Sequence, residues 1–287
     1  MEQLINHLYD NRITEDTLGV LYINEMMSKV EGIPNLSAVV LLIVESAKPN
    51  PLEHYDIKNK LVQLQWINKD ELERGSVNSS DSHLIDWVLS GMVLFEKDEY
   101  ITMYRENIND FPLMERKQKM LTELAKLIRK YNYGKKLFLN GCYLDAFNTI
   151  VCSLQHLAKL SIIEHGYYPE VNVWKQVKRI EPEIYKLYDE IVTGGENLEK
   201  RLELLFLAID FAIASKSKLS ATYLIEILNL KEPVDIEGVI TQLEFKGCVV
   251  ELNLLVDYLV QKGIIDIMKV KTDSEEIFRR FYYVRFR

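Results

Sequence analysis

The sequence predicts a multi-domain α+β protein made of a mixed-sheet α/β part, a helical bundle, and a C-terminal part of three helices and a β-hairpin. Three observations support this prediction. A buried-strand pattern at 38–44 lies among alternating strands and helices, long helical patterns follow Pro112, and short helices with two strand-like segments follow residue 215. A chain of 287 residues is long enough for two or three domains. We expect domains at 1–112, 113–215 and 216–287.

The first part is organised around seven consecutive apolar residues, Ala38 to Val44. The run is rich in β-branched side chains and short for a buried helix, which is typical of a strand buried on both faces at the centre of a mixed sheet. We expect the other strands at 17–24, 54–57, 60–67 and 92–95. We expect helices at 2–10, around 84–89 and at 98–109, with a polar loop at 75–82.

The second part carries helical periodicity throughout. Apolar residues recur with a period near 3.6 at 115–131 and 143–165, and shorter helices are expected at 171–180 and 182–192. The segment 196–215 is apolar on most of its faces, so we expect it at the centre of the bundle.

The last part changes pattern again. Helices are expected at 219–230, 235–245 and 251–262, and strands at 264–271 and 277–286. Three helices followed by a β-hairpin is the order of a winged helix.

Composition limits the classes of protein that fit. The hydrophobic content of 48% and charged content of 27% are ordinary for a well-packed protein, and the formal net charge of −8 argues against a surface that coats nucleic acid. Cys142, Cys152 and Cys248 show no paired or metal-ligand spacing. The N-terminus lacks a signal-peptide pattern, and apolar runs fall short of the ~20 residues of a membrane span. We expect a cytoplasmic protein with no membrane contact.

This order of parts resembles the bacterial nucleotidyltransferase-like proteins, which couple a nucleotidyltransferase-type α/β domain to a helical domain resembling a substrate-binding bundle and then to a winged helix-turn-helix. The resemblance spans essentially the whole chain and depends on the order of its segments. These are Thr17-Leu-Gly-Val-Leu, the strand at 38–44, Ile85 to Phe95, Gly141 to Asn148, Ile163 to Gly166 and Val173 to Val177.

The resemblance also implies where a nucleotide site lies. Active relatives hold the triphosphate with a Gly-Ser pair and two magnesium ions with an Asp-x-Asp pair and a third acid, because the ions clamp the attacking and leaving oxygens. Here Val20 replaces the serine. The two aspartate positions fall at Ser37 and Val39. If the alignment is shifted two residues earlier, they fall at Asn35 and Ser37 instead. The corresponding residues are Gly19, Asn35, Ser37, Val39 and Gln63 or Gln65. None is charged, so the resemblance predicts a vestigial site, no resident cofactor and no transferase activity.

One alternative is an active nucleotidyltransferase with atypical metal ligands. It would recruit its acids from Glu15, Asp16, Glu45 or Asp56, and would then use magnesium with a nucleotide. Without turnover, a nucleotide remains an expected ligand. A second alternative is a purely structural interaction protein that binds a protein partner or a second copy of itself through its apolar helices.

Histidines of the helical part make a poor catalytic or metal set. His156 and His165 lie nine residues apart on one predicted helix and face roughly opposite sides. Helical relatives that cut RNA carry an Arg followed by a His on a late helix, whereas no histidine follows Arg201 before Ser215. We expect His156 to be a hydrogen-bonded bundle residue and His165 a helix-end residue.

The C-terminal hairpin gives the strongest indication of a partner. Its basic residues alternate with aromatic ones, a composition that suits contact with phosphates or a minor groove. The residues expected to contact DNA or RNA are Lys269, Lys271, Arg279, Arg280 and Arg285. The third helix offers little positive charge for reading bases. Alternatively, the arginines protect a strand edge and the winged helix binds protein.

Overall fold

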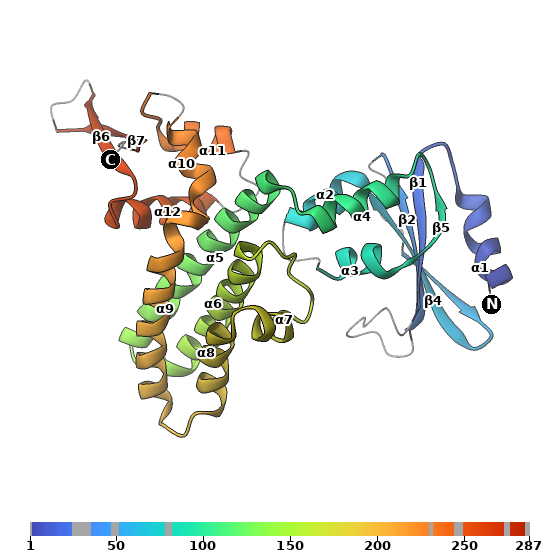
Figure 1. Ribbon diagram of the computed structural model, residues 1–287, viewed down its shortest axis with the longest axis horizontal. Coiled ribbons are helices and arrows are strands. Elements are labelled where there is room, and N and C mark those ends of the chain that lie inside the picture. Colours follow the sequence, from blue (N-terminus) through green and yellow to red (C-terminus); the bar gives the residue numbers. More distant parts are fainter. Residues whose placement is uncertain are drawn as a thin grey trace. The chain divides into compact units, whose positions relative to one another are not determined.

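In the computed structural model, the chain divides into two compact units, Met1–Pro112 and Leu113–Arg287. The structure describes residues 2–24, 36–46, 52–77, 82–229, 232–243, 249–272 and 276–284. The first unit holds a sheet with helices, and the second holds long helices and the C-terminal hairpin (Figure 1).

A mixed sheet forms the centre of the first unit. Within the described residues it has five strands in the order β3-β4-β2-β1-β5. Strand β2 pairs in parallel with β4 and antiparallel with β1, so it is the middle strand, and nearly all of it is buried. This confirms the central strand predicted from the run at 38–44. The strand bounds are Thr17–Asn24 (β1), Leu36–Val44 (β2), Leu52–Ile57 (β3), Lys60–Asn68 (β4) and Met92–Glu96 (β5).

A two-residue turn joins β3 and β4. Ile57 pairs with Lys60, and the intervening Lys58 and Asn59 have φ angles of 52° and 61°. Two successive positive φ angles give the hairpin turn whose twist matches that of paired strands. The turn fixes the register that places His54 opposite Gln63.

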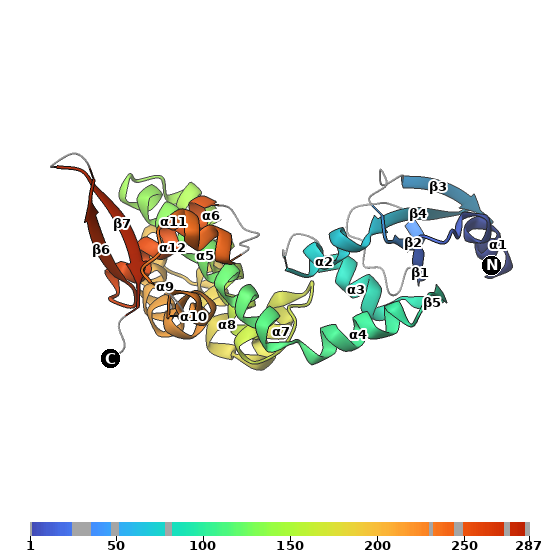
Figure 2. The same ribbon diagram turned by 90° about the horizontal axis from the view of Figure 1, so that it is seen from above.

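Helices cover both faces of this sheet (Figure 2). Helix α1 (Glu2–Tyr9), followed by the short η1 (Asp10–Arg12), contributes Ile5 and Tyr9 to the core on one face. Helices α2 (Lys69–Val77), α3 (Ser82–Ser90) and α4 (Tyr100–Asp110) contribute Leu72, Trp87 and Ile101, among others, to the core on the other face. The site positions on the strands therefore lie in a sheet that is packed from both sides.

Helix α2 corrects the polar loop expected from residue 75, because residues 75–77 are helical. Asn68 and Glu71 begin the helix with reciprocal bonds. The Asn68 Oδ1 accepts from the Glu71 N–H at 2.8 Å, and the Glu71 Oε2 accepts from the Asn68 N–H at 3.4 Å. Leu72, fully buried, anchors the helix to the sheet. Residues 78–81 of the expected loop lie outside the described residues, and Ser82 already belongs to α3.

Long helices form most of the second unit. Their bounds are Leu113–Leu139 (α5), Tyr143–Glu164 (α6), Val173–Ile180 (α7), Pro182–Thr193 (α8) and Leu198–Ser220 (α9). Among the helices that the structure describes, α6 alone is long and apolar enough to cross a membrane by length and composition. However, 61% of its most apolar stretch is buried in the unit, and buried core helices often share this length and composition.

Helix α9 differs from its prediction. It packs against α5 and α6 with one face only, and Leu204, Leu207 and Phe211 are 55%, 67% and 77% exposed. At 3.6 residues per turn these three side chains lie on the side of the helix opposite the buried ones. The buried residues are Leu202, Leu205, Phe206, Ile209 and Ile213. Two separate apolar stripes, rather than a central position in the bundle, explain the apolar sequence of α9.

The C-terminal elements pack directly on the long helices. They are α10 (Thr222–Asn229), α11 (Ile236–Leu243), α12 (Val249–Gln261), β6 (Asp266–Lys271) and β7 (Phe278–Tyr283). Ion pairs from α5 hold two of them, Lys117 with Glu226 at 2.6 Å and Arg129 with Glu251 at 3.0 Å. The expected division at 215/216 falls inside α9, and both parts belong to the second unit.

Candidate functional site

Gly19 serves close packing between a strand and a helix. A Cβ atom at this position would lie 2.4 Å from Cδ1 and 2.7 Å from Cγ1 of Ile101, which belongs to α4 and is fully buried. Such distances are far below van der Waals contact, so any larger residue here would force the buried Ile101 side chain to move. The space over Gly19 is therefore filled by an apolar side chain.

The pairing of β1 with β2 separates Gly19 from the other predicted site residues. Gly19 lies opposite Ile43, near the end of β2, whereas Ser37 and Val39 lie at its beginning. Four residues of strand, about 13 Å, divide Ile43 from Val39. The resemblance predicts that these positions form one site, but the antiparallel register does not bring Gly19 close to Ser37 and Val39.

Ser37, Val39 and Gln63 do lie together on neighbouring strands. The parallel register of β2 and β4 places Val39 beside Gln63, and Ser37 lies at an irregularity in the same pairing. Val39 is fully buried in the core under α2, α3 and α4, and Gln63 is only 4% exposed. Asn35 lies outside the described residues. The positions expected to hold metal ligands are thus built into, or border, a packed core.

An amide pair is the main polar feature at these positions. The Gln63 Nε2 donates to the Gln65 Oε1 at 3.0 Å, while the Gln63 Oε1 is buried and has no hydrogen-bond partner within the described chain. A buried acceptor without a partner costs free energy of about 1–3 kcal/mol. His54 lies opposite Gln63 and Asp56 opposite Leu61, so both project from the same face of the sheet, where they are exposed.

These residues do not fit a pair of magnesium ions. Magnesium requires oxygen ligands that usually include carboxylates, and Asp56 is the carboxylate that the β3–β4 register brings to this face. Asp16 and Glu45 lie at the other end of β2, where Asp16 accepts a bond from the Ser46 hydroxyl at 2.7 Å and the Glu45 N–H bonds its carbonyl. No cluster of three histidine, cysteine or acidic side chains suited to a metal occurs among the described residues.

The second unit contains a buried ionic cluster that the sequence did not reveal. Glu123 of α5 is 3% exposed, and its Oε2 lies 2.8 Å from the His156 Nδ1 and its Oε1 3.6 Å from the Lys126 Nζ. Burial alone raises the pKa of Glu123, but the hydrogen bond and charge of His156, with Lys126 and Lys159, lower it to about 2. His156 is thus a hydrogen-bonded bundle residue, as expected.

Lys119 lies close to the same cluster. Its ammonium is over the ring of Tyr168 at 4.2 Å and 4.0 Å from Glu115. Burial lowers the pKa of Lys119 to about 8, although Glu115 and Glu123 oppose that shift. The other sequence candidates in this unit have structural partners, since the His165 ring bonds the Ser161 carbonyl at 2.8 Å and Arg201 donates to the Ile191 carbonyl at 2.7 Å.

The register of the C-terminal hairpin divides its basic residues between two faces. Lys269 lies opposite Arg280 and Lys271 opposite Phe278, so these four residues share one face. We call Lys269, Lys271 and Arg280 the basic face; all three are exposed. Directly opposed like charges such as Lys269 and Arg280 destabilise a strand pair, and a bound anion offsets that cost.

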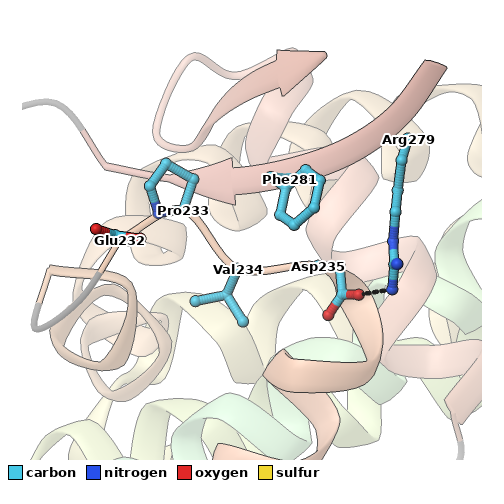
Figure 3. A pocket seen from close by; sticks show the side chains of 6 residues that line it. All are labelled: Glu232, Pro233, Val234, Asp235, Arg279 and Phe281. Atoms are coloured by element: carbon cyan, nitrogen blue, oxygen red, sulfur yellow. Dashed lines mark hydrogen bonds and ion pairs between the residues drawn. The ribbon is translucent and has the colours of Figure 1, made fainter. Parts of the chain in front are cut away.

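Arg279 projects from the other face and has a partner inside the protein (Figure 3). It forms an ion pair with Asp235 and lies over the ring of Phe281 at 5.6 Å. The Asp235 Oδ1 also accepts the N–H of Gly238 at 2.9 Å at the start of α11, and this bond, with the charge of Arg279, lowers the pKa of Asp235. Arg279, Asp235 and Phe281 line a surface pocket of about 590 Å³. Arg285 lies outside the described residues.

A backbone bridge attaches the hairpin to the helices. Val234 and Tyr282 exchange both of their N–H to carbonyl hydrogen bonds, at 3.0 and 2.7 Å, and so form a single antiparallel bridge beside β7. Helix α12, in the position of a reading helix, exposes Asn253, Asp257 and Gln261, and its Glu251 pairs with Arg129. The cationic surface of this part is therefore on the hairpin rather than on the helix.

Comparison with known proteins identifies three successive regions. Residues 1–116 match the family model for nucleotidyltransferase-like domains, residues 117–216 a YgxA-like substrate binding domain, and residues 222–284 a helix-turn-helix domain. The uncharacterized protein YgxA of Bacillus subtilis (strain 168) is 35% identical over 284 residues, covering 98% of this chain and 97% of that protein. A solved structure, the nucleotidyltransferase-like protein from Exiguobacterium sibiricum 255-15, aligns with a TM-score of 0.81 and 27% identity over 99% of each chain.

Proposed function

The chain belongs to the family of the Bacillus subtilis protein YgxA, with a nucleotidyltransferase-like domain and a helix-turn-helix domain, and from this premise we propose that it is a regulator without nucleotidyl transfer activity that contacts nucleic acid through its hairpin. The observation that carries the first part is the burial of Val39 and Gln63 at positions where transfer requires carboxylates. A valine in a packed core binds no cation.

The basic face carries the second part of the proposal. Lys269, Lys271 and Arg280 project from one side of an exposed hairpin beside the aromatic ring of Phe278. Such a surface binds phosphates through charge and releases condensed counterions, which gives affinity without base reading. Arg279 is excluded from this surface because Asp235 neutralises it. The exposed residues of α12 are neutral or acidic, so we assign the contact to the nucleic-acid backbone.

A salt series tests the nucleic-acid contact. Fluorescence anisotropy with a labelled DNA duplex, and with an RNA duplex of the same sequence, between about 50 and 200 mM salt should give a log–log slope of about −0.9 for each phosphate contacted. Lys269→Ala and Arg280→Ala should each reduce the slope by about one.

Matched controls come from the same chain. Arg279→Ala removes one charge from the adjacent strand position, and Lys186→Ala removes an exposed charge from α8; both should leave the slope nearly unchanged. No binding at low salt, or equal losses for Arg279 and Arg280 variants, would reject the assignment to the basic face.

A transfer assay tests the loss of activity separately. The full chain is incubated with each radiolabelled nucleoside triphosphate and Mg²⁺ or Mn²⁺, and we expect no transfer above that of a heat-denatured control. Metal-dependent transfer that disappears in Asp56→Asn would show that the exposed acid near Gln63 acts as a ligand, and the alternative of an active enzyme would replace our proposal.

We also propose a nucleotide as the ligand that this regulator senses, because residues 1–116 match the nucleotidyltransferase-like family; the Gln63 Oε1, which lacks a donor within the described chain, is the candidate acceptor. Amino and ring N–H groups of a base are donors of the required kind. Isothermal titration with each nucleotide in the presence of EDTA should detect binding that Gln63→Leu weakens. Binding that depends wholly on added metal would contradict this assignment.

A further inference from the structure

We propose that the outer face of α9, with the cavity between α9 and α5, is a docking site for a basic amphipathic helix of a partner protein. The face consists of Leu204, Leu207 and Phe211, each more than half exposed. Their spacing of three and four residues is the spacing of a coiled-coil seam. An exposed apolar seam of this kind usually marks an interaction site.

A cavity beside the seam offers a place for an anchoring side chain. It has a volume of about 170 Å³ and lies between α5 and α9. Tyr131 and Phe206 meet edge to face, with ring centres 5.8 Å apart, and Phe138 lies 5.3 Å from Phe206. Leu207 borders the same cavity, so cavity and seam are continuous. Apolar pockets next to an exposed stripe are where large anchoring side chains of a partner helix contribute most of the affinity.

Charge around the cavity identifies the occupant. Glu203 and Asp210 line it from α9, one turn before and one turn after Phe206–Leu207, and neither has an ion-pair partner within the described chain. Lys135 also lines it, but its ammonium donates to the Tyr131 hydroxyl at 3.4 Å. The acids follow the seam on one side, so they complement lysine or arginine residues flanking the apolar positions of a partner helix.

The same charges disfavour a second copy of this chain as the occupant. Two-fold antiparallel pairing of α9 with itself would bring Glu203 of one copy close to Asp210 of the other, which is a like-charge contact. The chain also carries a formal net charge of −8, so approach of a second copy is opposed at longer range. A basic helix meets neither penalty. This inference does not depend on the nucleic-acid contact of the hairpin.

Two synthetic peptides probe the site on the full-length chain. Both are capped helical peptides with leucine at the seam positions and one phenylalanine anchor, and one carries lysine and the other glutamate beside the seam. Fluorescence anisotropy should show the lysine peptide binding about tenfold tighter than the glutamate peptide, because two acidic side chains each contribute a modest attraction.

Variants of exposed residues locate the contact. Leu207→Ser and Phe211→Ser should abolish binding of the lysine peptide while leaving the melting temperature unchanged, because both side chains are exposed. Glu203→Gln with Asp210→Asn should equalise the two peptides, and Glu190→Gln, an exposed acid on α8, serves as the matched control. Equal binding of both peptides to the parent chain, or no binding of either, would overturn the proposal. So would a dimer in sedimentation velocity that Phe211→Ser dissociates, since the occupant would then be a second copy.

Discussion

Two buried regions of this protein handle charge in opposite ways. In the first unit, Val39 at the start of β2 and Gln63 beside it on β4 are both neutral, at positions where the resemblance to active nucleotidyltransferases predicts carboxylates. Between α5 and α6 in the second unit, no such chemistry is expected, yet Glu123 is buried among His156, Lys126 and Lys159. The difference teaches that burial of charge is tolerated where counter-charges converge from two helices, whereas the packed positions on β2 and β4 are filled by neutral side chains.

The largest effect should come from introducing an acid into the first region. Val39→Asp places a carboxylate in a core position with no exposed surface, so we expect a loss of about 4 kcal/mol or more in the free energy of unfolding. Urea titration followed by tryptophan fluorescence of the first unit, which contains Trp66 and Trp87, measures it. Val39→Thr, of nearly equal size, should cost much less. A stable Val39→Asp variant with new metal-dependent transfer would refute our account of this region.

Replacing the buried acid of the second region, Glu123, with a neutral residue should lower the free energy of unfolding slightly less than Val39→Asp does. Glu123→Gln leaves Lys126, Lys159 and His156 without the carboxylate that they surround, and removing one partner of such a buried set costs about 3 kcal/mol. Glu115→Gln is the matched control, because that acid is more exposed and lies 4.0 Å from Lys119, and we expect a cost below about 1 kcal/mol. Urea titration followed by the helical circular dichroism signal reports mainly on this unit, which holds the long helices.

The pH dependence of that variant has a defined sign. The pKa of Glu123 is about 2 in the folded protein against an ordinary 4.5, so its contribution is complete above pH 4.5 and is lost as the pH falls toward 2. The stability difference between the parent chain and Glu123→Gln should therefore narrow over this range. A difference that stays constant from pH 5 to pH 2 would mean that packing, rather than charge, is what the substitution removed.

A smaller effect should distinguish a packed contact at Gly19 from an open phosphate cradle. Gly19→Ala forces a Cβ against the Ile101 side chain, and overpacking of this kind costs about 2 kcal/mol. Ile101→Val removes the atom at 2.4 Å, so it should relieve part of that cost when the two substitutions are combined in a double-mutant cycle. Strictly additive losses would show that the two residues do not interact.

The smallest effect should appear on the hairpin, where charge is exposed. Arg280→Ala removes the like-charge pair with Lys269 and should raise the melting temperature slightly, in line with about 0.3 kcal/mol. Arg279→Ala should lower it, because the ion pair with Asp235 is lost. Differential scanning fluorimetry at low salt compares the two. Destabilisation by Arg280→Ala would indicate an attractive role for this side chain within the free protein.

Most elements of the fold could be predicted from the sequence because local periodicity encodes them. The run at 38–44 predicts the middle strand, and Lys58–Asn59 predicts the turn between β3 and β4. The arrangement of the site residues could not be predicted in the same way, because the register between two strands depends on both segments and cannot be inferred from either one alone. The resemblance groups Gly19 with Ser37 and Val39, whereas the antiparallel pairing of β1 and β2 places Gly19 beside Ile43.

Other failures share that cause. Asp235 and Arg279 are 44 positions apart, and Glu123 and His156 are 33 apart, so nothing local indicates either pair. The apolar sequence of α9 suggested a central helix because composition does not separate a buried stripe from an exposed one. Counting angular positions around the helix would have revealed the second stripe at Leu204, Leu207 and Phe211.

The ion pairs from α5 to α10 and α12 have a mechanical consequence. These two ion pairs attach the helices that support the hairpin to α5, a single helix of 27 residues. A nucleic acid bound to the hairpin, as we propose, would therefore be held in a fixed orientation relative to α5. A partner helix bound at the proposed docking site between α5 and α9 would then also be held in a fixed orientation relative to that nucleic acid.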